Sequence, residues 1–290
     1  MNSDAWWRRL VEVGLDIAVV TGVLYLFGLS RTNATLWTLG IHPSLVQLPM
    51  TEYVLRGINI AVPLLTVGVV LVLICFVLHR RFVVPAIAAP RYRRPRMIVE
   101  RLLKVTATIG VGGLVLAGLG MLAHDTLTGF WEYALPLGAT LGAAAILYAY
   151  TTLNSSNVWR DHGPWPVRMV ILLLLLGVVW SGTAYAEETG EDSARNFASD
   201  LSLQPEVIIF SQSRLAIAGR GVEVKVIGRG DERYRYCYRG LRLFIRSNDQ
   251  YVLMPVGWRW GDDALFLVPL ADNLRVDMRY GGAVSAVASC

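Results

Sequence analysis

Residues 167–186 read VRMVILLLLLGVVWSGTAYA, and this stretch decides the fold. Its one charged residue, Arg168, lies at its start. A helix of this length spans about 30 Å, which matches the apolar thickness of a bilayer. The stretch therefore predicts a membrane-spanning helix that separates an apolar N-terminal part of the chain from a polar C-terminal part.

Four more apolar stretches precede this one, so we expect a membrane α-helical bundle of about five spans. The expected spans are residues 10–29, 58–78, 102–123, 133–153 and 167–186. The fourth has the weakest hydropathy signal, and it carries Gly138 and Gly142 four residues apart. Small residues at this spacing let helices approach closely in lipid. We expect that packing within the chain, and a homo-oligomer is the alternative.

The distribution of basic residues predicts the orientation of the chain. Residues 1–186 hold 14 Lys/Arg against 8 Asp/Glu, whereas residues 187–290 hold 13 against 14. The positive-inside rule places the richer set of span ends, and the N-terminus, in the cytoplasm, and residues 187–290 outside. The basic excess thus reflects membrane topology and not nucleic-acid binding. The richer set is Arg8, Arg9, the eight basic residues from 80 to 104, Arg160 and Arg168, against Arg31 and Arg56 at the other ends.

Residues 205–280 predict a small all-β domain, a barrel or a sandwich, between a linker at 187–204 and a tail at 281–290. Short apolar or alternating runs recur here between turn residues. We expect Trp258 and Trp260 to cap its core, and an exposed adhesive edge is the alternative. Before the second span, residues 30–57 are too polar to cross, and Trp37 marks a short interfacial helix near 36–41. The eight runs are 207–210, 214–218, 222–227, 233–238, 241–246, 251–256, 264–269 and 274–278.

Asp16 and Arg56 are the intramembrane polar candidates. Asp16 lies deep in the first expected span, where a charge is costly unless it is paired, protonated or hydrated. It is therefore either an ion or proton site or a paired carboxylate. Its candidate partners in the second case are Arg8, Arg9 and Arg56.

Five arginines form a candidate anion-binding face. Arg233, Arg235 and Arg239 alternate along one expected strand, and Arg242 and Arg246 follow on the next. If the two strands pair as a hairpin, their guanidinium groups gather on one face and can bind carboxylate or phosphate. An anionic envelope polymer or a lipid headgroup is the expected ligand. The alternative is a solvated face balanced by the acids of the same domain.

No catalytic constellation is visible, and we expect no enzyme, no cofactor and no metal site. The four histidines are scattered outside the β domain without metal-ligand spacing. Three cysteines occur without a CxxC pair, and a disulfide between Cys237 and Cys290 is left open.

Four short motifs resemble a group of poorly characterised multi-pass membrane proteins of high-GC Gram-positive bacteria. They are GIHPSL at 40–45, YVLRG at 53–57, YRGLRL at 238–243 and LMPVGW at 253–258. The resemblance implies a bacterial plasma membrane and no known activity.

The function expected from these features is that of a non-enzymatic membrane protein. Its exported β domain would bind an envelope component or a partner membrane protein, with membrane lipid as its surroundings. The alternatives are a component of a channel or transporter, and a membrane effector of a stress or defence system.

Overall fold

The chain divides into two compact units. The computed structural model describes residues 3–85, 93–123, 129–155, 165–228, 233–247 and 249–280. The helical unit comprises Met1–Arg31 and Tyr53–Glu188, and the β unit comprises Thr32–Glu52 and Thr189–Cys290. The β unit therefore contains more than the expected C-terminal domain, because it also takes in the segment between the first two spans.

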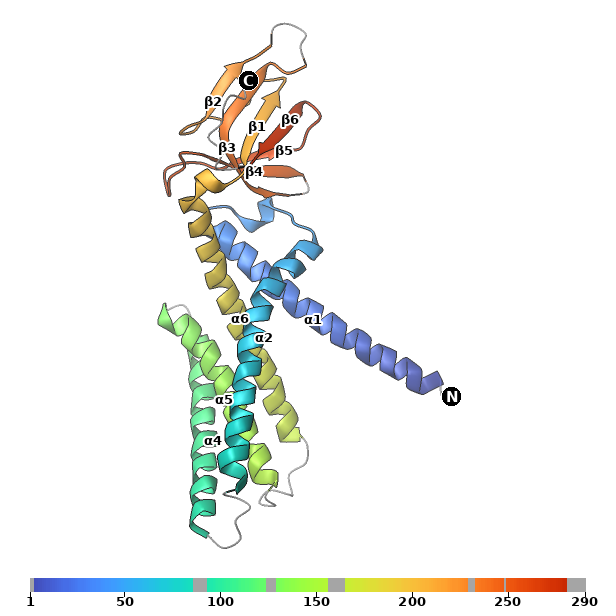
Figure 1. The fold of residues 1–290 in the computed structure, drawn as a ribbon, viewed down its shortest axis with the longest axis vertical. Helices are drawn as coiled ribbons and strands as arrows, with labels where there is room; N and C mark the ends of the chain where they lie inside the picture. Colours follow the sequence, from blue (N-terminus) through green and yellow to red (C-terminus); the bar gives the residue numbers. More distant parts are fainter. Residues whose placement is uncertain are drawn as a thin grey trace. The chain divides into compact units, whose positions relative to one another are not determined.

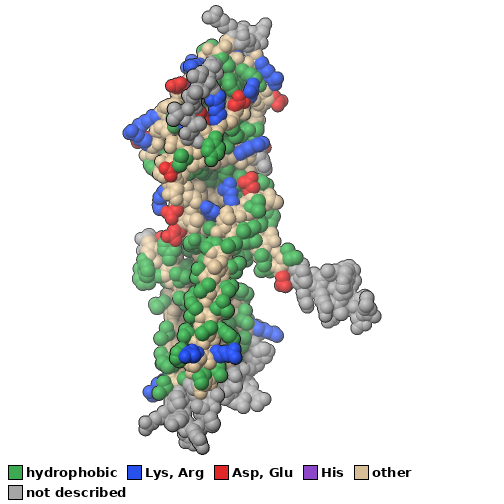
Figure 2. All heavy atoms as spheres, in the orientation of Figure 1, with side chains coloured by type: hydrophobic (Ala, Val, Ile, Leu, Met, Phe, Trp, Pro, Cys, Tyr) green, Lys and Arg blue, Asp and Glu red, His purple; other side chains and the backbone are tan. Residues whose placement is uncertain are grey.

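Long helices account for the N-terminal part of the chain (Figure 1). Five candidate membrane spans are found among the described residues, as expected. Figure 2 shows hydrophobic side chains along these helices, and both basic and acidic side chains over the sheet. A π-helical turn at His79–Val83 follows the second helix. The helices are α1 (Ser3–Thr38), α2 (Met50–Leu78), α4 (Arg93–Leu122), α5 (Phe130–Ser155) and α6 (Trp165–Ser199).

Helix α1 runs on through the region where a separate interfacial helix was expected. It ends at Thr38 and is capped by Gly40, whose φ of 77° is left-handed. The N–H of Gly40 donates to Trp37 O at 2.9 Å, and the N–H of Ile41 donates to Leu36 O at 2.8 Å. This is a Schellman cap, and its apolar pair, Leu36 and Ile41, is buried. The expectation of a second helix near 36–41 was wrong because nothing breaks the helix before Gly40.

Helix α6 likewise continues through most of the segment that was expected to be a linker. Glu191 and Arg195 form an ion pair of 2.8 Å one turn apart, in the order that favours a helix. The Ser193 hydroxyl donates to Thr189 O at 2.6 Å. Ala194 is also fully buried, and the ring of Phe197 packs edge to face on Phe244 with centroids 4.9 Å apart. Local polar contacts and packing in the β unit together extend the helix to Ser199.

Close backbone contacts join α4 to α5 in the helical unit, where the two helices run side by side (Figure 1). A Cβ atom at Gly142 would lie 2.6 Å from Gly110 O. Gly142 therefore serves packing within the chain, as expected, whereas Gly138 has open space at its own Cβ position. Of the five candidate spans, α5 has the largest buried share, 22%.

Replacement of Gly142 by Ala should destabilise the helical unit, whereas Gly138→Ala should not. The new methyl group at 142 collides with a backbone oxygen that cannot move alone, and such overpacking costs about 1–3 kcal/mol. At 138 the methyl group meets nothing. Thermal melting of the two variants in detergent tests this, and equal melting temperatures would contradict the α4–α5 contact.

The β unit is built on one antiparallel sheet (Figure 1). Its strand order is β5-β4-β3-β1-β6, and β2 also pairs with β3. The expected strand at 214–218 has no regular secondary structure and joins no ladder. The strands are β1 (Glu206–Ser211), β2 (Glu223–Val226), β3 (Tyr236–Arg246), β4 (Gln250–Pro255), β5 (Phe266–Pro269) and β6 (Leu274–Arg279).

Strand β3 replaces the hairpin that was expected around residue 240. Gly240 has a φ of 79°, and the pairing of β1 with β3 shifts register beside it. A Cβ atom there would collide with the carbonyl of Gly221. Glycine at this position therefore allows a bulge and close approach of a second backbone, and the chain continues as one strand.

Tyr238 lies at the centre of the core of the sheet and is fully buried. Its hydroxyl donates to Leu215 O at 2.8 Å and accepts from the Leu215 N–H at 2.6 Å. This pair of bonds satisfies the N–H and the carbonyl of Leu215, which lies in the segment that joins no ladder. Burial raises the pKa of Tyr238 above the ordinary tyrosine value of 10.0.

Tyr238→Phe should destabilise the β unit by about 1–3 kcal/mol, because both backbone groups of Leu215 lose their partner. In the natural protein, the raised pKa means that stability is fully present below pH 10 and is lost as the pH rises above it. The variant should lack this alkaline loss. Chemical unfolding followed between pH 8 and 11 checks both effects, and an unchanged alkaline slope in the variant would exclude Tyr238 as its source.

Candidate functional site

The segment at 32–52, which joins α1 to α2, belongs to the β unit. Two side chains at one end of the sheet donate hydrogen bonds to its backbone. The Ser247 hydroxyl donates to Gln47 O at 2.7 Å, and Gln250 Nε2 donates to Leu45 O. Val46 is 1% exposed, so the segment is part of the fold of this unit and not a free loop.

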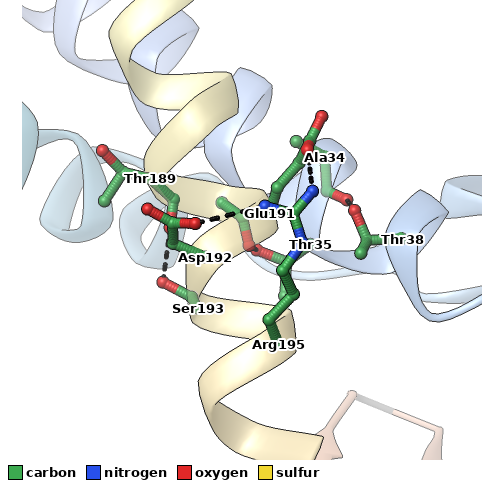
Figure 3. A network of polar contacts seen from close by, with 9 residues as sticks. Ala34, Thr35, Thr38, Thr189, Glu191, Asp192, Ser193 and Arg195 are labelled. Atoms are coloured by element: carbon green, nitrogen blue, oxygen red, sulfur yellow. Dashed lines mark hydrogen bonds and ion pairs between the residues drawn. The ribbon is translucent and has the colours of Figure 1, made fainter.

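The same segment is joined to the last turns of α6 (Figure 3). The Thr35 hydroxyl donates to Gly190 O at 2.9 Å. Beside it, Arg195 donates to Glu191 at 2.8 Å and to Asp192 at 3.3 Å. In the β unit, the end of α1, the end of α6 and the sheet are thus connected by hydrogen bonds.

A pocket of about 550 Å³ opens between this segment and the chain that leads from β4 to β5. This volume lies within the range of small-molecule sites. Trp258 and Trp260 pack edge to face, with ring centroids 4.9 Å apart. Trp258 is buried in the core as expected, but Trp260 is half exposed. The lining consists of Trp37, Thr38, Leu39, Gly40, Ile41, Leu45, Trp258, Trp260, Gly261, Asp263, Ala264, Leu265 and Leu267.

The polar groups of the pocket wall are engaged with the protein itself. The indole N–H of Trp258 donates to Asp263 O at 2.8 Å. The Asp263 carboxylate accepts from the Arg259 N–H at 2.9 Å and lies 3.6 Å from Arg220 Nε. Among the described residues of the lining, Asp263 is the one that is ionisable, so this part of the wall presents mainly aromatic and aliphatic surface.

The predicted arginine face forms only in part. The bulge at Gly240 keeps Arg239 and Arg242 on one face, where Glu223 lies directly across from Arg239 and Glu206 directly across from Arg242. Arg242 donates to Gln204 O at 3.0 Å. Acids therefore alternate with the arginines here, which is the balanced surface that the sequence left as the alternative. Anion binding at this face stays a prediction.

Arg246 does not share this face. A second register shift, after Leu243, places Arg246 opposite Tyr251, and its guanidinium lies 5.8 Å from the centroid of that ring. Arg233 lies 5.6 Å from the ring of Tyr234 in the same manner. The expected gathering of all five arginines was wrong because β3 is one bulged strand and not a hairpin.

Arg242→Met should lower the stability of the β unit by about 1–2 kcal/mol, since a hydrogen bond from a charged donor is lost in a half-buried site. Arg235→Met, at an exposed position before β3, should change it by less than about 0.5 kcal/mol. Unfolding of the full-length protein in detergent compares the two. A larger effect at Arg235 would contradict the structural role of Arg242.

The structure does not bring the two intramembrane candidates together. Leu24 of α1 meets Gly57 of α2, so Arg56 lies near the level of Leu24. Asp16 precedes Leu24 by eight residues, which is about 12 Å along a helix. Asp16 is exposed and Arg56 is half-buried. The side chains of Arg8 and Arg9 lie outside the described residues.

Cysteine and metal chemistry add little to the site. Cys237 is fully buried and disulfide-bonded, and Cys290 lies outside the described residues. Cys75 is free and exposed. In the described part of the chain, no group of three or more His, Cys, Asp or Glu side chains is placed to hold a metal ion.

Sequence reasoning missed the pocket as a site. It identified Trp37 as interfacial and treated Trp258 and Trp260 as core, but nothing in the sequence pairs residue 37 with residue 260. Comparison with known proteins does not supply a ligand. No protein-family model matches the chain, and no curated protein or solved structure matches it significantly.

Proposed function

We propose that this protein is a multi-pass protein of a bacterial plasma membrane whose β unit lies outside the cytoplasm and binds an envelope component or partner without catalysis. The observation that carries the proposal is the pocket, because its walls come from both separate parts of the β unit. A site assembled in this way requires both parts to lie on the same side of the membrane.

The number of spans satisfies this requirement. Leu45 is hydrogen-bonded to Gln250, and Gln47 to Ser247. The chain must therefore cross the membrane an even number of times between Gln47 and Ser247. Helices α2, α4, α5 and α6 supply four crossings. If α5 did not cross, the two parts would lie on opposite sides and could not meet. The contacts therefore support a spanning role for α5, whose mean hydropathy of 1.3 equals that of α1 and is lower than that of the other three candidate spans.

Charge and cysteine chemistry support an exported β unit. Residues 32–52 contain no Lys or Arg, whereas basic residues gather where α2 ends and α4 begins. This asymmetry favours the cytoplasm for the second set of span ends. The disulfide-bonded state of Cys237 agrees, because disulfides persist mainly in oxidising compartments outside the cytoplasm.

Cysteine labelling in intact cells tests the topology, and the Cys75→Ser protein without an added cysteine gives the background from Cys237 and Cys290. In a Cys75→Ser background, Gln47→Cys and Ser202→Cys, both at exposed positions, should react with a membrane-impermeant maleimide. Arg101→Cys, at the start of α4, should react only after the cells are permeabilised. The three variants differ in position and not in chemistry, so each serves as the control of the others.

Labelling of Gln47→Cys without Ser202→Cys would mean that the two parts of the β unit lie on opposite sides, and it would remove the pocket. Labelling of Arg101→Cys alone in intact cells would reverse the orientation and place the β unit in the cytoplasm.

A further inference from the structure

Strand β2 forms an open edge of the sheet. It pairs with β3, and no other described strand pairs with its outer side. All four of its residues are exposed, and Val226 is 72% exposed. The backbone groups on the open side of an edge strand can pair with a further strand. Residues 222–227, called here the β2 edge, are therefore a candidate docking surface.

The backbone of β2 turns a defined set of groups to this open side. The Ile227 N–H donates to Arg235 O at 2.9 Å, one position beyond the last ladder pair of β2 and β3. Hydrogen-bonded and non-hydrogen-bonded pairs alternate along an antiparallel ladder. The two charged residues of β2 therefore turn their N–H and carbonyl groups toward β3, whereas Val224 and Val226 turn theirs outward.

The sequence of the β2 edge is complementary to itself when two copies run antiparallel. Residues 222–226 read VEVKV, and a two-fold axis through Val224 places Glu223 of each copy directly across from Lys225 of the other. Opposite charges that face each other across two strands stabilise the pair, and like charges destabilise it. A pairing centred one residue earlier or later would instead place Glu223 or Lys225 across from its own copy.

The backbone groups and the charges select the same register. A pairing centred on Val224 uses its outward N–H and carbonyl, whereas one centred on Glu223 or Lys225 would need groups that already face β3. Within one chain the residue directly across from Lys225 is Cys237, which carries no charge. A second copy therefore supplies the acid that Lys225 lacks across this ladder.

We propose that β2 pairs with β2 of a second copy of this chain, about a two-fold axis through Val224, to form one continuous sheet. The pairing goes beyond the proposed function, because it involves neither the pocket nor its ligand. It uses residues of the β unit alone. An interface of about five residues from each copy is small, so the dimer is transient and its population depends on concentration.

Analytical ultracentrifugation of the full-length protein in detergent tests the proposal. The natural protein should form a dimer whose fraction rises with protein concentration. Val224→Pro removes the central outward N–H without removing a hydrogen bond to β3, so the association constant should fall by roughly tenfold or more. Val224→Thr keeps the N–H and the β-branched shape, and it should retain the dimer.

Charge reversal tests the register. Glu223→Lys and Lys225→Glu each bring like charges together in a pair of identical chains, so each variant alone should associate roughly tenfold more weakly or worse. An equal mixture of the two variants places lysine across from glutamate at both positions, and it should recover the dimer. Arg246→Glu reverses a charge at an exposed position at the other end of β3, and it should behave as the natural protein does.

A natural protein that stays monomeric over these concentrations would overturn the proposal and would leave the β2 edge to a strand of a different protein. A dimer that survives both Val224→Pro and Lys225→Glu would also overturn it, because that dimer uses another surface. Failure of the mixture to recover the dimer would exclude the register. None of these outcomes depends on the labelling of Gln47→Cys and Ser202→Cys, so the proposed function is tested separately.

Discussion

The contact between the segment at 32–52 and the end of the sheet is the constraint on which the rest of this architecture depends. Two side chains of the sheet region, Ser247 and Gln250, donate to backbone oxygens of that segment, and Val46 is almost completely buried. The contact makes one compact unit from two stretches of sequence separated by four helices. This contact requires three other features of the fold. They are the number of helices between the two stretches, the end of α1 at its Schellman cap on Gly40, and the length of α6.

The sequence was sufficient to predict five helices that are long and apolar enough to span a membrane, which the described residues contain, but not the ends of those helices. Hydropathy reports where lipid can surround a helix, and this is enough to locate each of the five apolar stretches. It says nothing of where the helix stops. Helix α1 continues past its apolar part until Thr38, and α6 continues until Ser199 with support from Glu191 and Arg195. Polar residues are compatible with a helix once they have left the membrane, so a polar segment need not be a linker.

In the β unit, the alternation of apolar and polar residues was sufficient to predict most of the strands, but one glycine was misinterpreted. A glycine at this position predicts a turn, yet Gly240 forms a bulge. Sequence does not separate the two cases, because a turn and this kind of bulge both favour a glycine with positive φ. The arrangement of the arginines was mispredicted for a separate reason, because a second register shift, after Leu243, moves Arg246 to the other face. The pocket was beyond sequence reasoning for a different reason. Its tryptophans are distant in the chain, and only the packing of the 32–52 segment brings them together.

The divided β unit has a consequence for the order of synthesis. On the proposed topology, residues 32–52 reach the outside early, while the strands that pair with them are translated last. At ordinary rates of translation the interval is on the order of tens of seconds. During that time Val46 and Leu48, which are buried in the finished fold, have no sheet to cover them. The protein therefore cannot mature one domain at a time from its N-terminus, and its first external loop is exposed to proteases and to wrong partners until the last span has been inserted.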